Sequence, residues 1–177
     1  KLCGCGTDRE AVLRTLNTDA TPTVIRDIVS VVGDGSVYVS YRGEEFLVDG
    51  FEDKVGKWAH LAVTNDYNTL KIYMNGDLVG TYNVNDSSPV GGTTVVELGG
   101  ALSEFLPYTG SLDEVRLWGT ARSHAEIKQN RDFYFDSLEE KYLALYWGFD
   151  QESDDHRTQS LTPASEAHYS ASSASSE

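Results

Sequence analysis

The sequence predicts an all-β protein, an antiparallel two-sheet sandwich with one short helix near its C-terminal end. Segments rich in β-branched and aromatic residues recur about every ten residues from Thr23 onward. Gly-Asp-Gly, Arg-Gly and Asp-Gly turns separate the first of these segments. After Trp118 the spacing of apolar residues changes from alternating to helical, which places the helix late in the chain.

Three parts are expected along the chain: an arm over residues 1–22, the sandwich over 23–150, and an acidic Ser/Ala-rich tail over 151–177. The spacing of Ala11, Val12, Leu13 and Leu16 predicts a short peripheral helix within the arm. The tail has few large apolar residues, so it cannot bury enough surface to offset the entropy of ordering it. The first strands of the sandwich are expected within residues 23–32, 36–43 and 44–51.

The local signals are clearest in the second half of the sandwich. Asn75-Gly76 follows the alternating segment Leu70 to Met74, and both residues tolerate the positive φ that a type I′ hairpin turn needs. Ser123 is followed three residues later by Glu126, which predicts a capping box at the start of the helix. Further strands are expected at residues 94–100, 111–118 and 141–150.

The composition argues against two classes of partner. The chain has 14 Lys and Arg against 28 Asp and Glu, a formal net charge of −14 at pH 7. A chain this acidic repels nucleic acid and anionic membrane surfaces. No run of apolar residues is long enough to span a bilayer, so we expect no membrane insertion.

Cys3 and Cys5 are the only cysteines of the sequence. One intervening residue makes a bond between them strained. In a secreted protein, such cysteines favour interchain disulfides. Two unremarkable thiols in a flexible terminus are the alternative.

Three linked motifs point to a known family. Trp58 and His60 form a W-x-H pattern, Tyr73 to Gly76 form Y-x-N-G, and Gly110 to Trp118 form G-x-x-D-E-V-R-x-W. Over roughly Ser36 to Asp150 this order resembles the laminin G-like or pentraxin-like jelly roll of the concanavalin A-like superfamily. The resemblance implies a jelly-roll sandwich, in which Trp58 and His60 serve structure, and an extracellular or cell-surface location.

The resemblance also suggests a calcium site. Alternation within a strand over residues 111–118 would place Asp113 on a face with aliphatic side chains, where a carboxylate needs donors or a metal ion. In related sandwiches an aspartate at this point can bind calcium, and Asp150 could lie near it. The alternative is that Asp113 caps a loop through backbone hydrogen bonds.

Sugar binding needs an aromatic platform with polar groups beside it. Tyr67, Tyr108 and Trp118 are the candidates, although tyrosines also suit protein interfaces. Asn85 begins the sequon Asn-Asp-Ser in an expected loop, so it is a candidate glycosylation site.

Catalysis is not expected. Laminarinase-like enzymes of the same fold carry E-x-D-x-x-E on one strand, and this chain lacks that pattern. We therefore expect a non-catalytic binding or adhesion module that recognises glycans or extracellular proteins, with calcium as a possible cofactor. The alternative is a structural subunit that self-assembles through its terminal arms and interchain cysteines.

Overall fold

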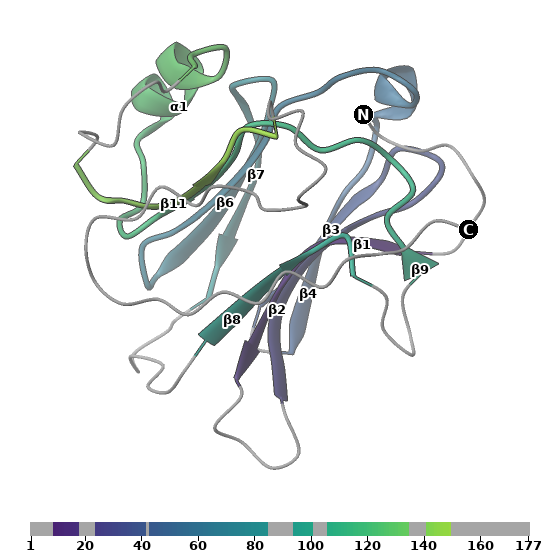
Figure 1. Cartoon of the computed structure of the whole chain (residues 1–177), viewed down its shortest axis with the longest axis horizontal. Coiled ribbons are helices and arrows are strands. Elements are labelled where there is room, and N and C mark those ends of the chain that lie inside the picture. The colour runs from purple at the N-terminus through teal and green to yellow at the C-terminus, as the bar shows by residue number, and fades with distance from the viewer. Residues whose placement is uncertain are drawn as a thin grey trace. The chain divides into compact units, whose positions relative to one another are not determined.

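The computed structural model describes residues 9–17, 24–41, 43–84, 94–100, 106–134 and 141–149. The chain divides into two compact units, residues 1–111 and 112–177, which are taken in turn. Nearly all regular structure is antiparallel β-sheet (Figure 1). The expected all-β class with a single short helix is confirmed for the described residues.

The first unit contains a six-stranded sheet. Its strands run in the order β4-β3-β2-β1-β8, all antiparallel, and the short β9 pairs in parallel with β1. β1 is paired on both edges, with the next strand in sequence and with a distant one: Leu13 pairs with Val29 on β2 and with Leu98 on β8. The bounds are β1 Glu10–Asn17, β2 Val24–Val31, β3 Val37–Tyr41, β4 Glu44–Val48, β8 Thr94–Leu98 and β9 Leu106–Pro107.

The expected arm is therefore wrong for residues 10–17. These residues form β1 within the sheet and not a peripheral helix. Hydrogen bonding to strands on both sides outweighs the weak helical spacing of the segment. A bulge between Ala11 and Leu13 lets Val12 pack against the core, which explains why the apolar residues of β1 do not alternate regularly. The sandwich thus begins before residue 23.

The second sheet of this unit is a three-stranded meander, β5-β6-β7. Its strands are β5 Leu61–Asn65, β6 Thr69–Met74 and β7 Asp77–Asn83, and a 3₁₀ turn at Glu52–Lys54 lies between β4 and β5. The predicted hairpin turn is confirmed, because Asn75 and Gly76 have φ of 53° and 83°. Two hydrogen bonds join Asn75 to His60. The His60 amide donates to Asn75 Oδ1 at 2.9 Å, and the Asn75 amide donates to the His60 carbonyl at 2.8 Å.

The core lies between the two sheets of the first unit. Alternate residues of β3 and β4 face inward and meet buried residues of β6. One cluster joins Val31 and Val37 to Met74, and a second joins Val39 and Val48 to Leu70 and Ile72. Phe51 packs against both clusters, so the two sheets share one apolar interior.

Gly35 allows the β2–β3 turn to approach the segment that carries Phe51. Gly35 has φ of +92°, and a Cβ added there would lie 2.4 Å from the Phe51 carbonyl oxygen. No larger residue fits at this position without a shift of the main chain.

The second unit contains β10 (Val115–Trp118), α1 (His124–Asn130) and β11 (Leu143–Trp147). β10 pairs with β11 in antiparallel fashion. The predicted capping box is confirmed: the Ser123 side chain accepts from the Glu126 amide, and the Glu126 carboxylate accepts from the Ser123 amide. The hydrogen bond from the Ser123 backbone amide lowers the pKa of the Glu126 carboxyl group, which therefore stays ionised at the start of the helix.

Candidate functional site

Tyr67 lies at the tip of the turn that joins β5 to β6. Its φ is 73°, in the left-handed region that most side chains avoid, and it is 64% exposed. The Tyr67 amide donates to Asn65 Oδ1 at 2.9 Å. Asp66 Oδ1 accepts from the amides of Asn68, at 3.3 Å, and Thr69, at 2.8 Å. The side chains of the turn thus fix the backbone that presents the ring.

This turn is also anchored to the neighbouring strand. The Val84 amide, directly after β7, donates to the Asn68 carbonyl at 2.9 Å. The left-handed conformation of Tyr67 costs about 1–2 kcal/mol. Strained residues of this kind concentrate at binding and catalytic sites, because the surrounding contacts must hold them in place. The turn combines a rigid exposed ring with the polar side chains of Asn65, Asp66 and Asn68.

Tyr108 does not join Tyr67. It is half-buried and packs against the core cluster of Val31, Val37 and Met74. Met74 ends β6, whereas Tyr67 precedes its start, and the strand from Thr69 to Met74 is about 17 Å long. Tyr108 therefore contributes to the core near one end of the meander, and Tyr67 lies at the other.

Trp118 is held within the second unit. It ends β10, and the Arg122 guanidinium lies over its ring, 4.2 Å from the centroid. Arg122 also forms an ion pair with Glu126 at 3.1 Å. One face of the Trp118 ring is covered, so Trp118 is a weaker platform than Tyr67.

Trp58 was expected to help close the sandwich, but its side chain is 61% exposed. It lies outside the strands, three residues before β5, while its neighbour Ala59 packs against the core. The sequence motif marked the position but not the direction of the side chain. Trp58 is thus a second exposed ring of the first unit, without the left-handed backbone of Tyr67.

Asp113 is not on a strand face. The strand that was expected over residues 111–118 begins only at Val115, because Glu114 has φ of 52° and breaks the alternation. Asp113 is exposed, and its Oδ1 accepts from the Glu114 amide at 2.9 Å. The loop-capping alternative for Asp113 describes this contact.

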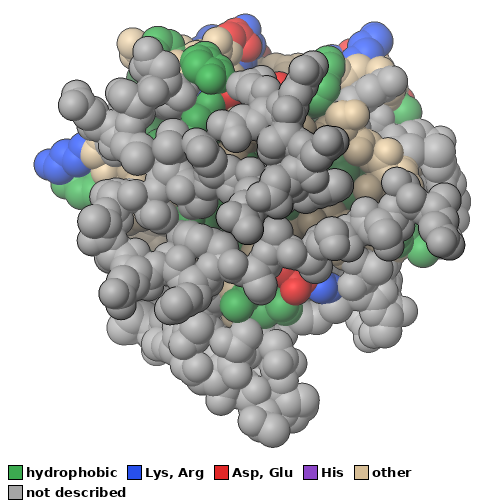
Figure 2. Space-filling view, viewed as in Figure 1, with side chains coloured by type: hydrophobic (Ala, Val, Ile, Leu, Met, Phe, Trp, Pro, Cys, Tyr) green, Lys and Arg blue, Asp and Glu red, His purple; other side chains and the backbone are tan. Residues whose placement is uncertain are grey.

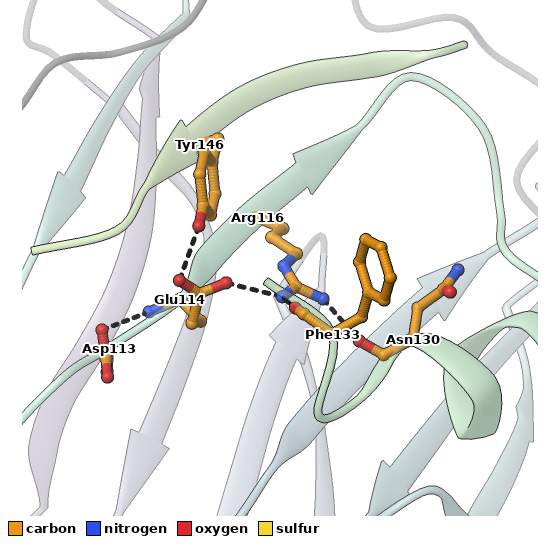
Figure 3. A network of polar contacts seen from close by, with 6 residues as sticks. All are labelled: Asp113, Glu114, Arg116, Asn130, Phe133 and Tyr146. Atoms are coloured by element: carbon orange, nitrogen blue, oxygen red, sulfur yellow. Dashed lines mark hydrogen bonds and ion pairs between the residues drawn. The ribbon is translucent and has the colours of Figure 1, made fainter. Parts of the chain in front are cut away.

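Glu114 is a partly buried carboxylate of the second unit, and sequence reasoning missed it (Figure 3). Its carboxylate accepts from the Tyr146 hydroxyl at 2.5 Å and from Arg116 Nη2 at 2.6 Å. Arg116 in turn donates to the carbonyl oxygens of Asn130, at 2.7 Å, and Phe133. The network joins β10 to β11 and to the end of α1, so its geometry serves structure. Only the D-E-V-R motif marked these residues in advance.

The described residues do not by themselves fit a calcium ion. Calcium takes six to eight oxygen ligands, and Asp113 is the one candidate that the structure places. Both oxygens of the adjacent Glu114 already accept hydrogen bonds, one of them from a cationic Arg116. Among the described residues, no three His, Cys, Asp or Glu side chains gather as a metal site.

Four predicted site residues lie outside the described part of the chain, namely Asp150, Cys3, Cys5 and Asn85. The calcium site, the interchain disulfides and the glycosylation of Asn85 therefore stay predictions. The tail over residues 151–177 lies outside the described part as well.

Comparison with known proteins decides the family. A laminin G-type family model, described as the concanavalin A-like lectin/glucanases superfamily, matches residues 9–128. The chain belongs to the concanavalin A-like lectin/glucanases superfamily. This match confirms the resemblance read from the motifs, and it extends further toward the N-terminus, to include β1.

Two solved structures share features with this concanavalin A-like chain. A candidate carbohydrate-binding protein from Bacteroides ovatus is 22% identical, with a TM-score of 0.64 over 85% of this chain and 44% of that protein. An S-layer domain-containing protein from Clostridium thermocellum is 20% identical, with a TM-score of 0.37 over 60% of this chain and 56% of that one. The chain thus spans less than half of the first protein's length. No curated protein matches the chain.

Among the described residues, no helix has both the length and the apolar character needed to cross a membrane.

Proposed function

We propose that this chain is a non-catalytic carbohydrate-binding module that acts outside the cell, and that the ring of Tyr67 is the platform of its binding site. The observation that carries the proposal is the exposed, left-handed Tyr67, held by Asn65 and Asp66. A rigid aromatic side chain offers contact area to the C–H face of a sugar and loses little entropy on binding.

The polar groups around Tyr67 suit sugar hydroxyls. Asn65 and Asp66 each accept a hydrogen bond within the turn through Oδ1. These bonds fix the directions of the other polar atoms of the two side chains, the Asn65 amide nitrogen and Asp66 Oδ2. Asn68 adds a second side-chain amide, and this residue is exposed. Amides and carboxylates of fixed direction supply the specificity in such sites, while the ring supplies contact area.

The charge of the site favours uncharged glycans. Asp66 places a carboxylate beside Tyr67, and the chain carries a formal net charge of −14. On the face shown in Figure 2, basic side chains are isolated or lie next to acidic ones, and the coloured residues form no continuous basic patch. Sulfated or uronic-acid-rich chains would be repelled by the Asp66 carboxylate and by the net negative charge of the chain.

The family and the Bacteroides ovatus protein support this proposal in a general way. Concanavalin A-like sandwiches include lectins and glucanases, and the solved protein of similar fold is described as a candidate carbohydrate-binding protein. Its 22% identity shows a shared fold, so the assignment of a site depends on the geometry of the Tyr67 turn.

The proposal is tested on an array of neutral, sulfated and uronic-acid glycans with the full chain. We expect binding to neutral glycans, and we expect Tyr67→Ala to weaken it roughly tenfold or more, the usual effect of removing a central aromatic contact. Trp58→Ala is the matched control, because it removes a similarly exposed ring from an unstrained backbone. Binding that survives Tyr67→Ala but is lost in Trp58→Ala would place the site elsewhere, and a silent array would refute the function itself.

A further inference from the structure

The outer face of the six-stranded sheet carries a second group of aromatic and charged side chains. Pairing of β3 with β4 sets Tyr38 opposite Leu47 and Ser40 opposite Glu45. Because side chains alternate along a strand, these four point away from the core. Their neighbours face inward and belong to the core clusters, namely Val37, Val39, Phe46 and Val48.

Arg9 joins this face from the residue before β1. Its guanidinium lies over the ring of Tyr38, with Cζ 3.7 Å from the centroid. Its two terminal nitrogens both reach the Glu45 carboxylate: Nη1 contacts Oε1, and Nη2 contacts Oε2 at 3.2 Å. A planar guanidinium that pairs through both nitrogens and stacks on a ring is held in one orientation.

The group is accessible. Side-chain exposure is 29% for Arg9 and 50% for Glu45, and Leu47 beside them is also exposed. Closer to β8, the residues of the same face are buried, among them Ala11, Arg14 and Ser30. The accessible part is therefore the half of the face formed by β3 and β4.

Stability alone gives little reason for this arrangement. An exposed ion pair typically contributes no more than about 1 kcal/mol to the free energy of folding. The hydrogen bond from Arg9 lowers the pKa of Glu45, and the pKa of Arg9 is raised by the same bond, so both groups stay charged over a wide range of pH. The arrangement instead holds a hydrogen-bond acceptor, the Glu45 carboxylate, in a fixed position beside a donor, the Arg9 guanidinium.

We propose that Arg9, Tyr38 and Glu45 form a second saccharide site, which takes the vicinal hydroxyl groups of a neutral pyranose. Glu45 accepts from one hydroxyl and Arg9 donates to the next, while Leu47 and the exposed part of the Tyr38 ring contact the C–H groups of the sugar. The inference rests on the proposed glycan-binding function, but it concerns residues on a different sheet from Tyr67.

The test uses the full chain with maltohexaose, cellohexaose and laminarihexaose as neutral probes, and affinities come from calorimetric titration. Glu45→Gln removes the charge and keeps the shape. Glu44→Gln is its matched control, because Glu44 is the exposed neighbour on the opposite side of the same strand. Each variant is measured alone and together with Tyr67→Ala.

We expect the Tyr67→Ala protein to retain weak binding, and Glu45→Gln to lower that residual affinity roughly tenfold. Glu44→Gln should leave it unchanged. Arg9→Lys, which keeps the charge but not the planar fork, should match Glu45→Gln, and it replaces that variant if Glu45→Gln does not fold.

The outcomes separate the two proposals. If Glu45→Gln binds every probe as tightly as its parent while Tyr67→Ala loses binding, the second site is overturned and the first stands. If Glu45→Gln loses binding and Tyr67→Ala does not, the second site stands and the Tyr67 site is overturned. If the unmodified chain binds none of the probes, both sites are overturned for neutral hexose chains.

Discussion

The Tyr146 hydroxyl donates a hydrogen bond of 2.5 Å to the carboxylate of Glu114 across the β10–β11 pair. Glu114 carries a left-handed backbone, so this bond and the ion pair with Arg116 hold a residue that would otherwise relax. We expect Tyr146→Phe to lower the free energy of unfolding by about 1–2 kcal/mol, the usual range for a hydrogen bond to a charged group. Urea denaturation measures this, with the exposed Tyr134→Phe as control.

Arg116 should matter more than Tyr146. It donates to the carbonyl oxygens of Asn130 and Phe133 as well as to Glu114. Arg116→Ala leaves these acceptors and the half-buried carboxylate without their donor, and we expect a loss of about 3 kcal/mol. A loss no larger than that of Tyr146→Phe would show that water replaces the guanidinium without cost.

Gly35 and Gly43 form a matched pair for measuring a steric contact. Both have positive φ, but an added Cβ meets the Phe51 carbonyl at Gly35 and nothing within 4 Å at Gly43. Gly43→Ala should cost about 1–2 kcal/mol from backbone strain alone. Gly35→Ala should cost clearly more in the same denaturation experiment, because Phe51 must move and it packs against both core clusters.

The Tyr67 turn should show opposite effects on binding and on stability. Tyr67→Gly removes the ring but suits the left-handed backbone, so the free energy of unfolding should stay level or rise by up to about 1 kcal/mol. Glycan binding should weaken in the same variant by roughly tenfold or more, as in Tyr67→Ala. A marked destabilisation, measured by thermal unfolding, would mean that the ring is a packing residue and not a platform.

The Arg9–Glu45 pair predicts a modest dependence of stability on pH. Its hydrogen bond lowers the pKa of Glu45 in the folded state, so its contribution is present above the unfolded pKa and is lost as the pH falls through the folded value. Because Glu45 is half exposed, the loss should be below about 1 kcal/mol between pH 6 and pH 3. Urea denaturation at both pH values measures this loss. The difference between the unmodified protein and Glu45→Gln isolates the contribution of Glu45.

Local signals predicted the local structure well. The Asn75-Gly76 turn and the Ser123–Glu126 capping box depend on residues within one turn, and both formed as expected. The sequence also identified Tyr67 as an exposed candidate, because it lies in a polar turn between two strands.

Features that depend on distant residues were missed. β1 reads as a weak helix, and its strand character comes from partners on β2 and β8. Glu114 lies in a motif typical of a strand, and its left-handed backbone depends on contacts with Tyr146 and Arg116. The side-chain directions of Trp58 and Tyr108 likewise depend on packing that no short motif encodes.

The place of β1 in its sheet has a consequence for how the protein is made. Leu13 leaves the ribosome before its partner Leu98, which follows only after the whole meander has been synthesised. Until then one edge of β1 is an unpaired template that another nascent chain can extend. Pairing between residues so distant in sequence is also slow to form. We therefore expect this protein to need dilute conditions or chaperones during synthesis, and we expect chains truncated before residue 98 to aggregate.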